Sequence, residues 1–134
     1  DPQWLAELVN AAERHSKAGM VASKILVWED PSVIDKCGHL MYPDGQNRGR
    51  GSGQKDRGQF DTEEEVLWPD GCAALYRHAM LEETGGFDED FFAYADDADL
   101  RSENAAQRHA HRVDRGLRRA VQCWNHHGAS RTTD

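Results

Sequence analysis

Residues 85–100 constrain the fold more than any other segment, because a glycine pair leads directly into interleaved aromatic and acidic residues. The segment contains six acids and four aromatic side chains, the latter at Phe87, Phe91, Phe92 and Tyr94. A purely solvated acidic loop needs no such anchors, so we expect these aromatic side chains to be buried and to hold the backbone rigidly. Asp96 and Asp97 then form a fixed carboxylate pair. Such a pair raises the pKa of one member and suits cation binding or proton transfer.

The composition is that of one globular domain. The chain has 134 residues, of which 38% are hydrophobic and 30% charged, and this length is enough for one core. No apolar run is long enough to span a membrane, and no segment has the pattern of a signal peptide. Cys37, Cys72 and Cys123 lack the spacing of a zinc site or a disulfide framework, which favours reduced thiols in a cytoplasmic protein.

The charge is divided unevenly along the chain. Residues 1–100 carry 9 basic and 21 acidic side chains, whereas residues 101–134 carry 7 and 3, and all seven of these cations are arginine. The composition shift predicts a boundary at Leu100, followed by an Arg- and His-rich tail that is either disordered or the product of a disturbed reading frame. A basic arm for nucleic acid is a weaker alternative, because the net charge of −8 does not favour a nucleic-acid partner.

Strand-like and helix-like segments alternate along residues 1–84, which predicts an α/β layer architecture. A helix is predicted from Asp1 as N-cap and Pro2 as first helical residue to a stop at Gly19. Its apolar stripe consists of Trp4, Leu5, Leu8, Val9 and Ala12. The other predicted elements are strands at 20–28, 39–42, 65–68 and 72–76, a turn at 43–45, and a helix at 77–83 ended by the glycines at 85 and 86.

Residues 43–60 combine five glycines with four cations, Arg48, Arg50, Lys55 and Arg57. A phosphate-binding loop of the Walker type is excluded because its Gly-x4-Gly-Lys-Ser/Thr spacing is absent. We therefore predict a flexible surface loop.

Three motifs follow one another between Trp68 and Leu100. They are Pro69-Asp70-Gly71-Cys72 before an apolar strand and Arg77, then Gly85-Gly86-Phe87-Asp88-Glu89, then Asp96-Asp97-Ala98-Asp99-Leu100. This order resembles the second half of the catalytic domain of family 2 glycosyltransferases, particularly the bacterial rhamnosyltransferase-like members. Residues 1–5 and 19–26 look like the helix and strand that follow the Asp-x-Asp motif of that family.

The resemblance covers residues 1–100 and implies a partial GT-A domain, which is a Rossmann-like α/β fold with a mixed sheet and flanking helices. Residues 1–100 correspond to its acceptor-side half, and residues 101–134 depart from the family pattern. The nucleotide-binding strands and the Asp-x-Asp are expected before Asp1, so we expect this segment to be inactive by itself.

The implied activity is that of an inverting glycosyltransferase, which moves a sugar from a nucleotide-sugar donor to a saccharide or lipid-linked acceptor. Asp97 matches the general base of the family. Asp96 supports it, because a like-charged neighbour raises its pKa toward neutrality. The resemblance also implies that Asp70, Gly71 and Cys72 shape the acceptor or sugar side. In the family, the region that matches residues 43–60 is a variable loop near the active site, so Arg48 and Arg50 are candidates for substrate contact.

The resemblance also implies a divalent metal, Mg or Mn, which neutralises the leaving diphosphate and is held mainly by the upstream Asp-x-Asp. His126 is the candidate for the metal-ligand histidine near the end of the family's domain. Typical donors and acceptors are deoxythymidine-diphosphate rhamnose and a cell-surface polysaccharide. The expected location is the cytoplasm, with peripheral association at the inner face of the membrane as an option for the full-length protein.

Two other classes of protein remain as alternatives. Residues 81–85 resemble the core of the Nudix box of diphosphate hydrolases, although His78 and Ala79 stand where that box requires Arg and Glu. A non-catalytic module that binds calcium through the acidic loop is the second alternative. The loop lacks the glycine that an EF-hand requires at its sharp turn.

Overall fold

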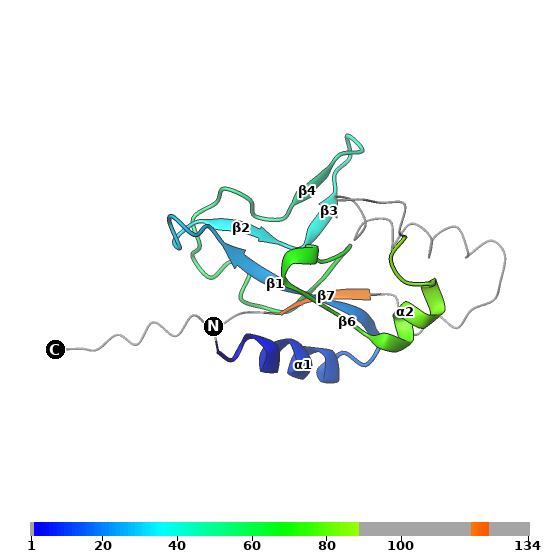
Figure 1. Ribbon diagram of the computed structural model, residues 1–134. Helices are drawn as coiled ribbons and strands as arrows, with labels where there is room; N and C mark the ends of the chain where they lie inside the picture. The colour runs from blue at the N-terminus through cyan, green and yellow to red at the C-terminus, as the bar shows by residue number, and fades with distance from the viewer. Residues whose placement is uncertain (1, 89–118, 124–134) are drawn as a thin grey trace.

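The computed structural model describes residues 2–88 and the backbone of residues 119–123 (Figure 1). These residues form a small mixed α/β domain in which a five-stranded sheet is accompanied by two helices and a two-stranded hairpin. The elements are α1 (Trp4–Arg14), β1 (Ala18–Leu26), β2 (Ile34–Cys37), β3 (His39–Met41), β4 (Asn47–Gly49), β5 (Glu64–Val66), a 3-10 turn (Gly71–Ala73), β6 (Ala74–Tyr76), α2 (His78–Thr84) and β7 (Arg119–Cys123).

Strand β1 is the centre of the larger sheet. Its residues Ala18–Ser23 pair in parallel with β7, which in turn pairs antiparallel with β5. Along its other edge, β1 pairs antiparallel first with β6 and then with β2. The predicted mixed sheet with flanking helices is confirmed at this coarse level. The described residues contain no Rossmann-like parallel sheet, because β1 and β7 are their only parallel pair.

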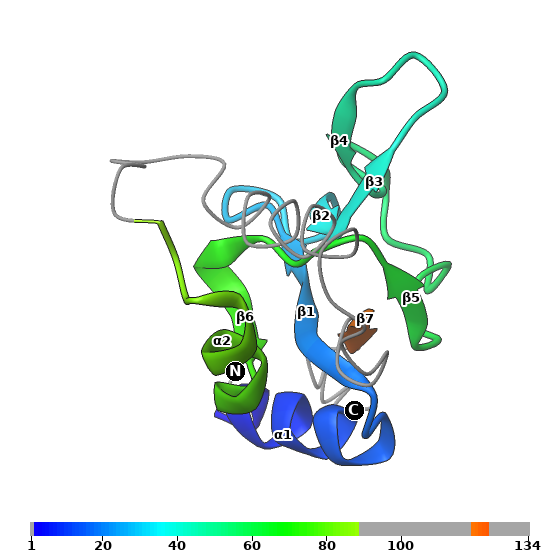
Figure 2. The same ribbon diagram turned by 90° about the vertical axis from the view of Figure 1, so that its right-hand side faces the viewer.

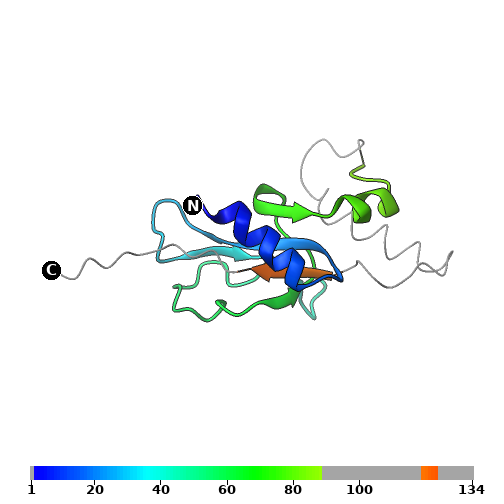
Figure 3. The ribbon, with the colours of Figure 1, turned by 90° about the horizontal axis from the view of Figure 1, so that it is seen from below.

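Two apolar clusters lie on opposite faces of β1, because successive side chains of a strand point to opposite sides. Val21 packs with the buried face of α1, which consists of Leu8, Ala11 and Ala12. Met20 and Ala22 pack with Val66 of β5 and Met80 of α2. Figure 3 shows α1 lying across β1 and β7. Both helices are therefore held to the sheet by the alternation of side chains along one buried strand.

The predicted ends of the first helix were wrong. The helix begins at Trp4 with Gln3 as N-cap, because the Gln3 carbonyl accepts the first intrahelical hydrogen bond, from Glu7 N–H at 2.9 Å. It ends at Arg14, and Gly19 lies inside β1 rather than at the helix terminus. The predicted apolar stripe was only partly right, since Leu5 and Val9 are exposed and Ala11 takes their place in the core.

The prediction of a flexible loop over residues 43–60 was also wrong in part. Asn47–Gly49 forms β4, which pairs with β3 in the hairpin that projects from the sheet in Figure 2. The turn predicted at 43–45 is confirmed, with Gly45 N–H donating to the Tyr42 carbonyl at 2.9 Å. Arg50 is buried, and its guanidinium lies over the Phe60 ring at 4.5 Å and pairs with Glu64 at 2.5 Å. Arg50 is therefore an anchor of the loop.

The helix predicted at 77–83 is confirmed as α2, one residue further along the chain. Gly85 and Gly86 follow it with φ of +87° and +84°, which is the left-handed conformation that favours glycine. Phe87 is 42% exposed and touches Tyr76 edge-on, with ring centroids 5.2 Å apart, so its predicted burial is incomplete. The other three aromatic residues of the segment, Phe91, Phe92 and Tyr94, lie outside the described residues.

Candidate functional site

Asp70 lies where the chain leaves β5 and enters the 3-10 turn, and it is the N-cap of that turn. Its Oδ1 accepts a hydrogen bond from Cys72 N–H at 3.2 Å, and its carbonyl accepts one from Ala73 N–H at 3.1 Å. A carboxylate at this position satisfies a backbone donor that would otherwise be unpaired. The sequence Asp-Gly-Cys thus folds into a tight turn whose conformation depends on the Asp70 side chain.

The other carboxylate oxygen of Asp70 meets two side chains from distant strands. Lys36 Nζ of β2 lies 3.0 Å from Oδ2, and His39 Nε2 of β3 lies 3.4 Å from the same atom. All three side chains are largely buried, with exposed fractions of 27%, 14% and 18% for Lys36, His39 and Asp70. The site therefore joins β2, β3 and the turn after β5 through one carboxylate.

His39 also attaches the β3–β4 hairpin to the segment that leads into Asp70. Its ring stacks on Trp68 with centroids 5.5 Å apart, and its Nδ1 lies 3.0 Å from Asn47 Oδ1. Its backbone N–H donates to the Trp68 carbonyl, and its carbonyl accepts from Leu67 N–H, both at 3.0 Å. The Trp68 indole N–H is buried, and no acceptor for it lies among the residues that the structure describes.

The electrostatics of the cluster keep Asp70 ionised. Burial alone would raise the pKa of Asp70, but hydrogen bonds from Cys72 and Lys36 outweigh this and hold the pKa well below its usual range. The hydrogen bond to Asp70 raises the pKa of Lys36. Desolvation and the hydrogen bond to Asp70 raise the pKa of the Cys72 thiol to about 11. Near neutral pH, Asp70 is therefore a poor proton acceptor and Cys72 a poor nucleophile.

The structure places the predicted substrate residues Asp70, Gly71 and Cys72 in one exposed turn, with the Asp70 side chain directed inward. The predicted base Asp97, its neighbour Asp96 and the candidate metal ligand His126 lie outside the described residues. Their relation to the turn remains a prediction.

No group of three or more His, Cys, Asp or Glu side chains that could hold a metal ion occurs within residues 2–88. The residues that the resemblance assigns to the divalent metal, an Asp-x-Asp before Asp1 and His126, lie outside the described part of the chain, so the metal site stays a prediction. Among the same residues, no helix is both long enough and apolar enough to cross a membrane.

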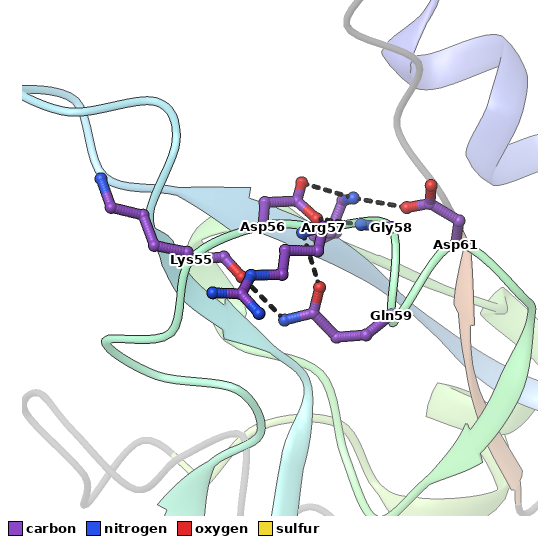
Figure 4. Close-up of polar contacts among 7 residues, drawn as sticks. Lys55, Asp56, Arg57, Gly58, Gln59 and Asp61 are labelled. Carbon is purple, nitrogen blue, oxygen red and sulfur yellow. Dashed lines mark hydrogen bonds and ion pairs between the residues drawn. The ribbon is translucent and has the colours of Figure 1, made fainter.

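A second polar cluster holds the loop between β4 and β5 against β1, and it was not predicted from the sequence. Lys24 of β1, whose side chain is 4% exposed, donates to Asp56 Oδ2 at 2.7 Å and to Asp61 Oδ1 at 2.6 Å. Burial alone would lower the pKa of Lys24, but the hydrogen bonds to the two carboxylates outweigh it and raise the pKa. In Figure 4 the Gln59 side chain also bridges the loop, accepting from Arg57 N–H and donating to the Lys55 carbonyl.

Lys36, His39 and Lys24 were not recognised in the sequence because their partners lie 31 to 37 residues away. The isolated lysine in the apolar run of β1 was the one available signal, since a buried lysine requires a carboxylate partner.

Comparison with protein-family models, with curated proteins and with solved structures found no match for this chain.

Proposed function

We propose that this chain is the acceptor-side part of an inverting family 2 glycosyltransferase of the GT-A fold. It would act with a nucleotide-sugar donor and a saccharide or lipid-linked acceptor. The observation that carries the proposal is the order of the three motifs between Trp68 and Leu100. The first two motifs occur as a capped turn, a strand, a short helix and a left-handed glycine pair, a succession that is compatible with the proposal.

The proposed chemistry assigns proton removal to Asp97. Its carboxylate takes the proton of an acceptor hydroxyl while the hydroxyl oxygen forms a bond to the anomeric carbon. The bond from that carbon to the nucleoside diphosphate breaks on the opposite face, so the configuration is inverted. An ordinary Asp has a pKa of about 3.9, and the like charge of Asp96 raises it toward the working range.

Asp70 is unsuited to the role of base because lysine and backbone hydrogen bonds stabilise its ionised form. A carboxylate with a strongly lowered pKa accepts a proton poorly in a transition state. This contrast supports assigning Asp70 to the shape of the site and Asp97 to its proton chemistry. A divalent metal, when bound, neutralises the leaving diphosphate, and no described residue is assigned to it.

The proposal is tested by a transfer assay on the complete reading frame that contains this segment, with labelled nucleotide sugars as donors. Asp97→Asn is expected to lower transfer by about 100-fold or more while leaving nucleotide-sugar affinity unchanged. Asp99→Asn is the matched control, because it removes a nearby carboxylate that has no proposed catalytic role. Full activity of Asp97→Asn would exclude this residue as the base.

The products of the same assay test the reaction class. A transferase forms a glycosylated acceptor and releases a nucleoside diphosphate. A Nudix-like hydrolase instead adds water to the diphosphate and releases a nucleoside monophosphate and a sugar phosphate. Acceptor-independent formation of those two products would replace the transferase proposal with the hydrolase.

A further inference from the structure

The Asp70 carboxylate is surrounded by groups of this chain. Lys36 Nζ and His39 Nε2 lie against Oδ2, and the Cys72 backbone N–H donates to Oδ1. A carboxylate has about four lone-pair sites. These three contacts therefore occupy most of the sites at which Asp70 could accept a hydrogen bond from a substrate hydroxyl.

Lys36 reaches Asp70 by passing over Gly49, which faces His39 across the β3–β4 hairpin. A Cβ at Gly49 would lie 2.9 Å from Lys36 Cβ, which is closer than real Cβ contacts. The φ of Gly49 is outside the left-handed region, so the backbone does not require glycine here. The demand for glycine at this position comes instead from the space that the Lys36 side chain occupies.

We infer that Lys36 and Gly49 are positioning residues of the proposed saccharide site, acting through Asp70 on the Gly71–Cys72 turn. Gly49 leaves the path for Lys36, Lys36 holds the carboxylate, and the carboxylate caps the turn. The inference rests on the proposed function only for the nature of the ligand. In this arrangement the acceptor contacts the exposed Gly71–Cys72 turn and does not pair with the Asp70 carboxylate.

The experiment follows the Asp70 carboxyl group by carbon-detected NMR during an acid titration of the whole chain. Lys36→Met removes the ammonium group and is expected to raise the pKa of Asp70 by about 1 or more. Gly49→Ala is expected to raise it in the same direction, because the added methyl group displaces Lys36. Lys36→Arg is expected to restore most of the wild-type value.

Lys55→Met is the matched control, because Lys55 pairs with Asp30 on the surface and does not contact Asp70. The double variant Lys36→Met/Gly49→Ala tests whether Gly49→Ala acts by displacing Lys36 or by loosening the surrounding structure in general. If Gly49 acts through Lys36, Gly49→Ala adds nothing to the pKa of Asp70 once Lys36 is absent. An equal further rise in the double variant would overturn the role of Gly49.

Binding of a mixture of methyl glycosides, followed by saturation-transfer NMR, distinguishes this inference from the proposed function. If the pKa of Asp70 responds to Lys36→Met but no glycoside binds the wild-type chain, the positioning role stands and the saccharide site does not. If glycosides bind while Lys36→Met leaves the pKa of Asp70 unchanged, the positioning role is wrong and the saccharide site stands. Lys36→Met and Gly49→Ala change the same contact, that of Lys36 with Asp70, from two different strands. If one of these variants fails to fold, the other still tests the inference.

Discussion

At the scale of single residues, the carboxylate of Asp70 affects the reactivity of the thiol beside it. Burial and the hydrogen bond to this anionic neighbour both favour the protonated thiol, and together they raise the pKa of Cys72 to about 11. Asp70→Asn replaces this anion by a neutral amide. We expect the pKa of Cys72 to fall and its alkylation by iodoacetamide to begin at a lower pH.

The measurement is the alkylation rate of Cys72 as a function of pH, located by peptide mass spectrometry. Cys37 serves as an internal reference, because burial raises its pKa to about 12 and the charges that act on it are those of Lys24, Arg50, Asp56 and Asp61 rather than Asp70. Asp44→Asn is the control variant, since Asp44 pairs with Arg48 at the tip of the hairpin. An identical pH profile in Asp70→Asn and wild type would contradict the proposed contact.

Alanine substitutions at Gly45 and Gly51 distinguish the cost of backbone strain from the cost of a steric clash in the unfolding free energy. Their φ values are +77° and +75°, so alanine is strained to a similar extent at both positions. A Cβ at Gly45 meets nothing within 4 Å, whereas at Gly51 it lies 2.5 Å from the Phe60 ring. We expect Gly45→Ala to cost about 1 kcal/mol of unfolding free energy and Gly51→Ala about 1–3 kcal/mol more. Urea denaturation measures both, and equal costs would show that Phe60 does not pack against Gly51.

At the scale of elements, the loop between β4 and β5 is held by a buried cation from the central strand. Lys24→Met leaves Asp56 and Asp61 without their common partner. We expect a loss of about 2 kcal/mol in unfolding free energy. This is below the usual cost of breaking a buried pair, because Asp61 is 38% exposed and is screened by solvent.

Urea denaturation measures this loss, and amide exchange at Gly58, which donates to Asp56 Oδ1, locates it in the loop. Lys55→Met is the control, since its pair with Asp30 is exposed and such pairs contribute about 0–1 kcal/mol. If Lys24→Met and Lys55→Met lower the unfolding free energy equally, Lys24 does not hold the loop between β4 and β5 in place.

The elements that could be predicted are those marked by a residue pattern within one continuous stretch of the sequence. The apolar stripe predicted the first helix, and the run from Met20 predicted β1, but Gln3 is not one of the residues whose side chains usually cap a helix, and its side chain makes no capping hydrogen bond. Strands β2 and β4 have only four and three residues, too few for a clear sequence pattern, and their stability comes from partners across the sheet and the hairpin.

The same distinction applies to the candidate site. The turn at Asp70–Cys72 is a local motif, and its residues could be selected from the sequence. Its partners Lys36 and His39 come from two other strands, and no local pattern marks them. The predicted catalytic pair, Asp96 and Asp97, stays a prediction from motif order.

At the scale of the whole molecule, a late segment of the chain completes the sheet. Strand β7 lies between β1 and β5 and supplies both with backbone hydrogen bonds, although it falls within the predicted tail 101–134. A chain truncated after residue 118 exposes one edge of β1 and leaves β5 without its partner. We expect a lower urea midpoint and concentration-dependent aggregation, because open strand edges recruit other strands.

Truncation after Cys123 is the matched control, because it keeps β7 and removes only residues 124–134. Urea denaturation and size-exclusion chromatography compare the two truncated chains. If truncation after residue 118 leaves both measurements unchanged, β7 does not contribute to the stability of the sheet.

The parallel pairing of β1 with β7 also determines when this domain can mature during protein synthesis. Strand β1 ends at Leu26, but its parallel neighbour begins only at Arg119. The nascent chain must therefore hold an apolar strand with one open edge while all the residues between the two strands are translated. Contacts between such distant segments form slowly, and exposed intermediates of this kind are substrates for chaperones. The yield of folded protein in cells should consequently depend on translation speed and chaperone supply more strongly than the small size of the domain suggests.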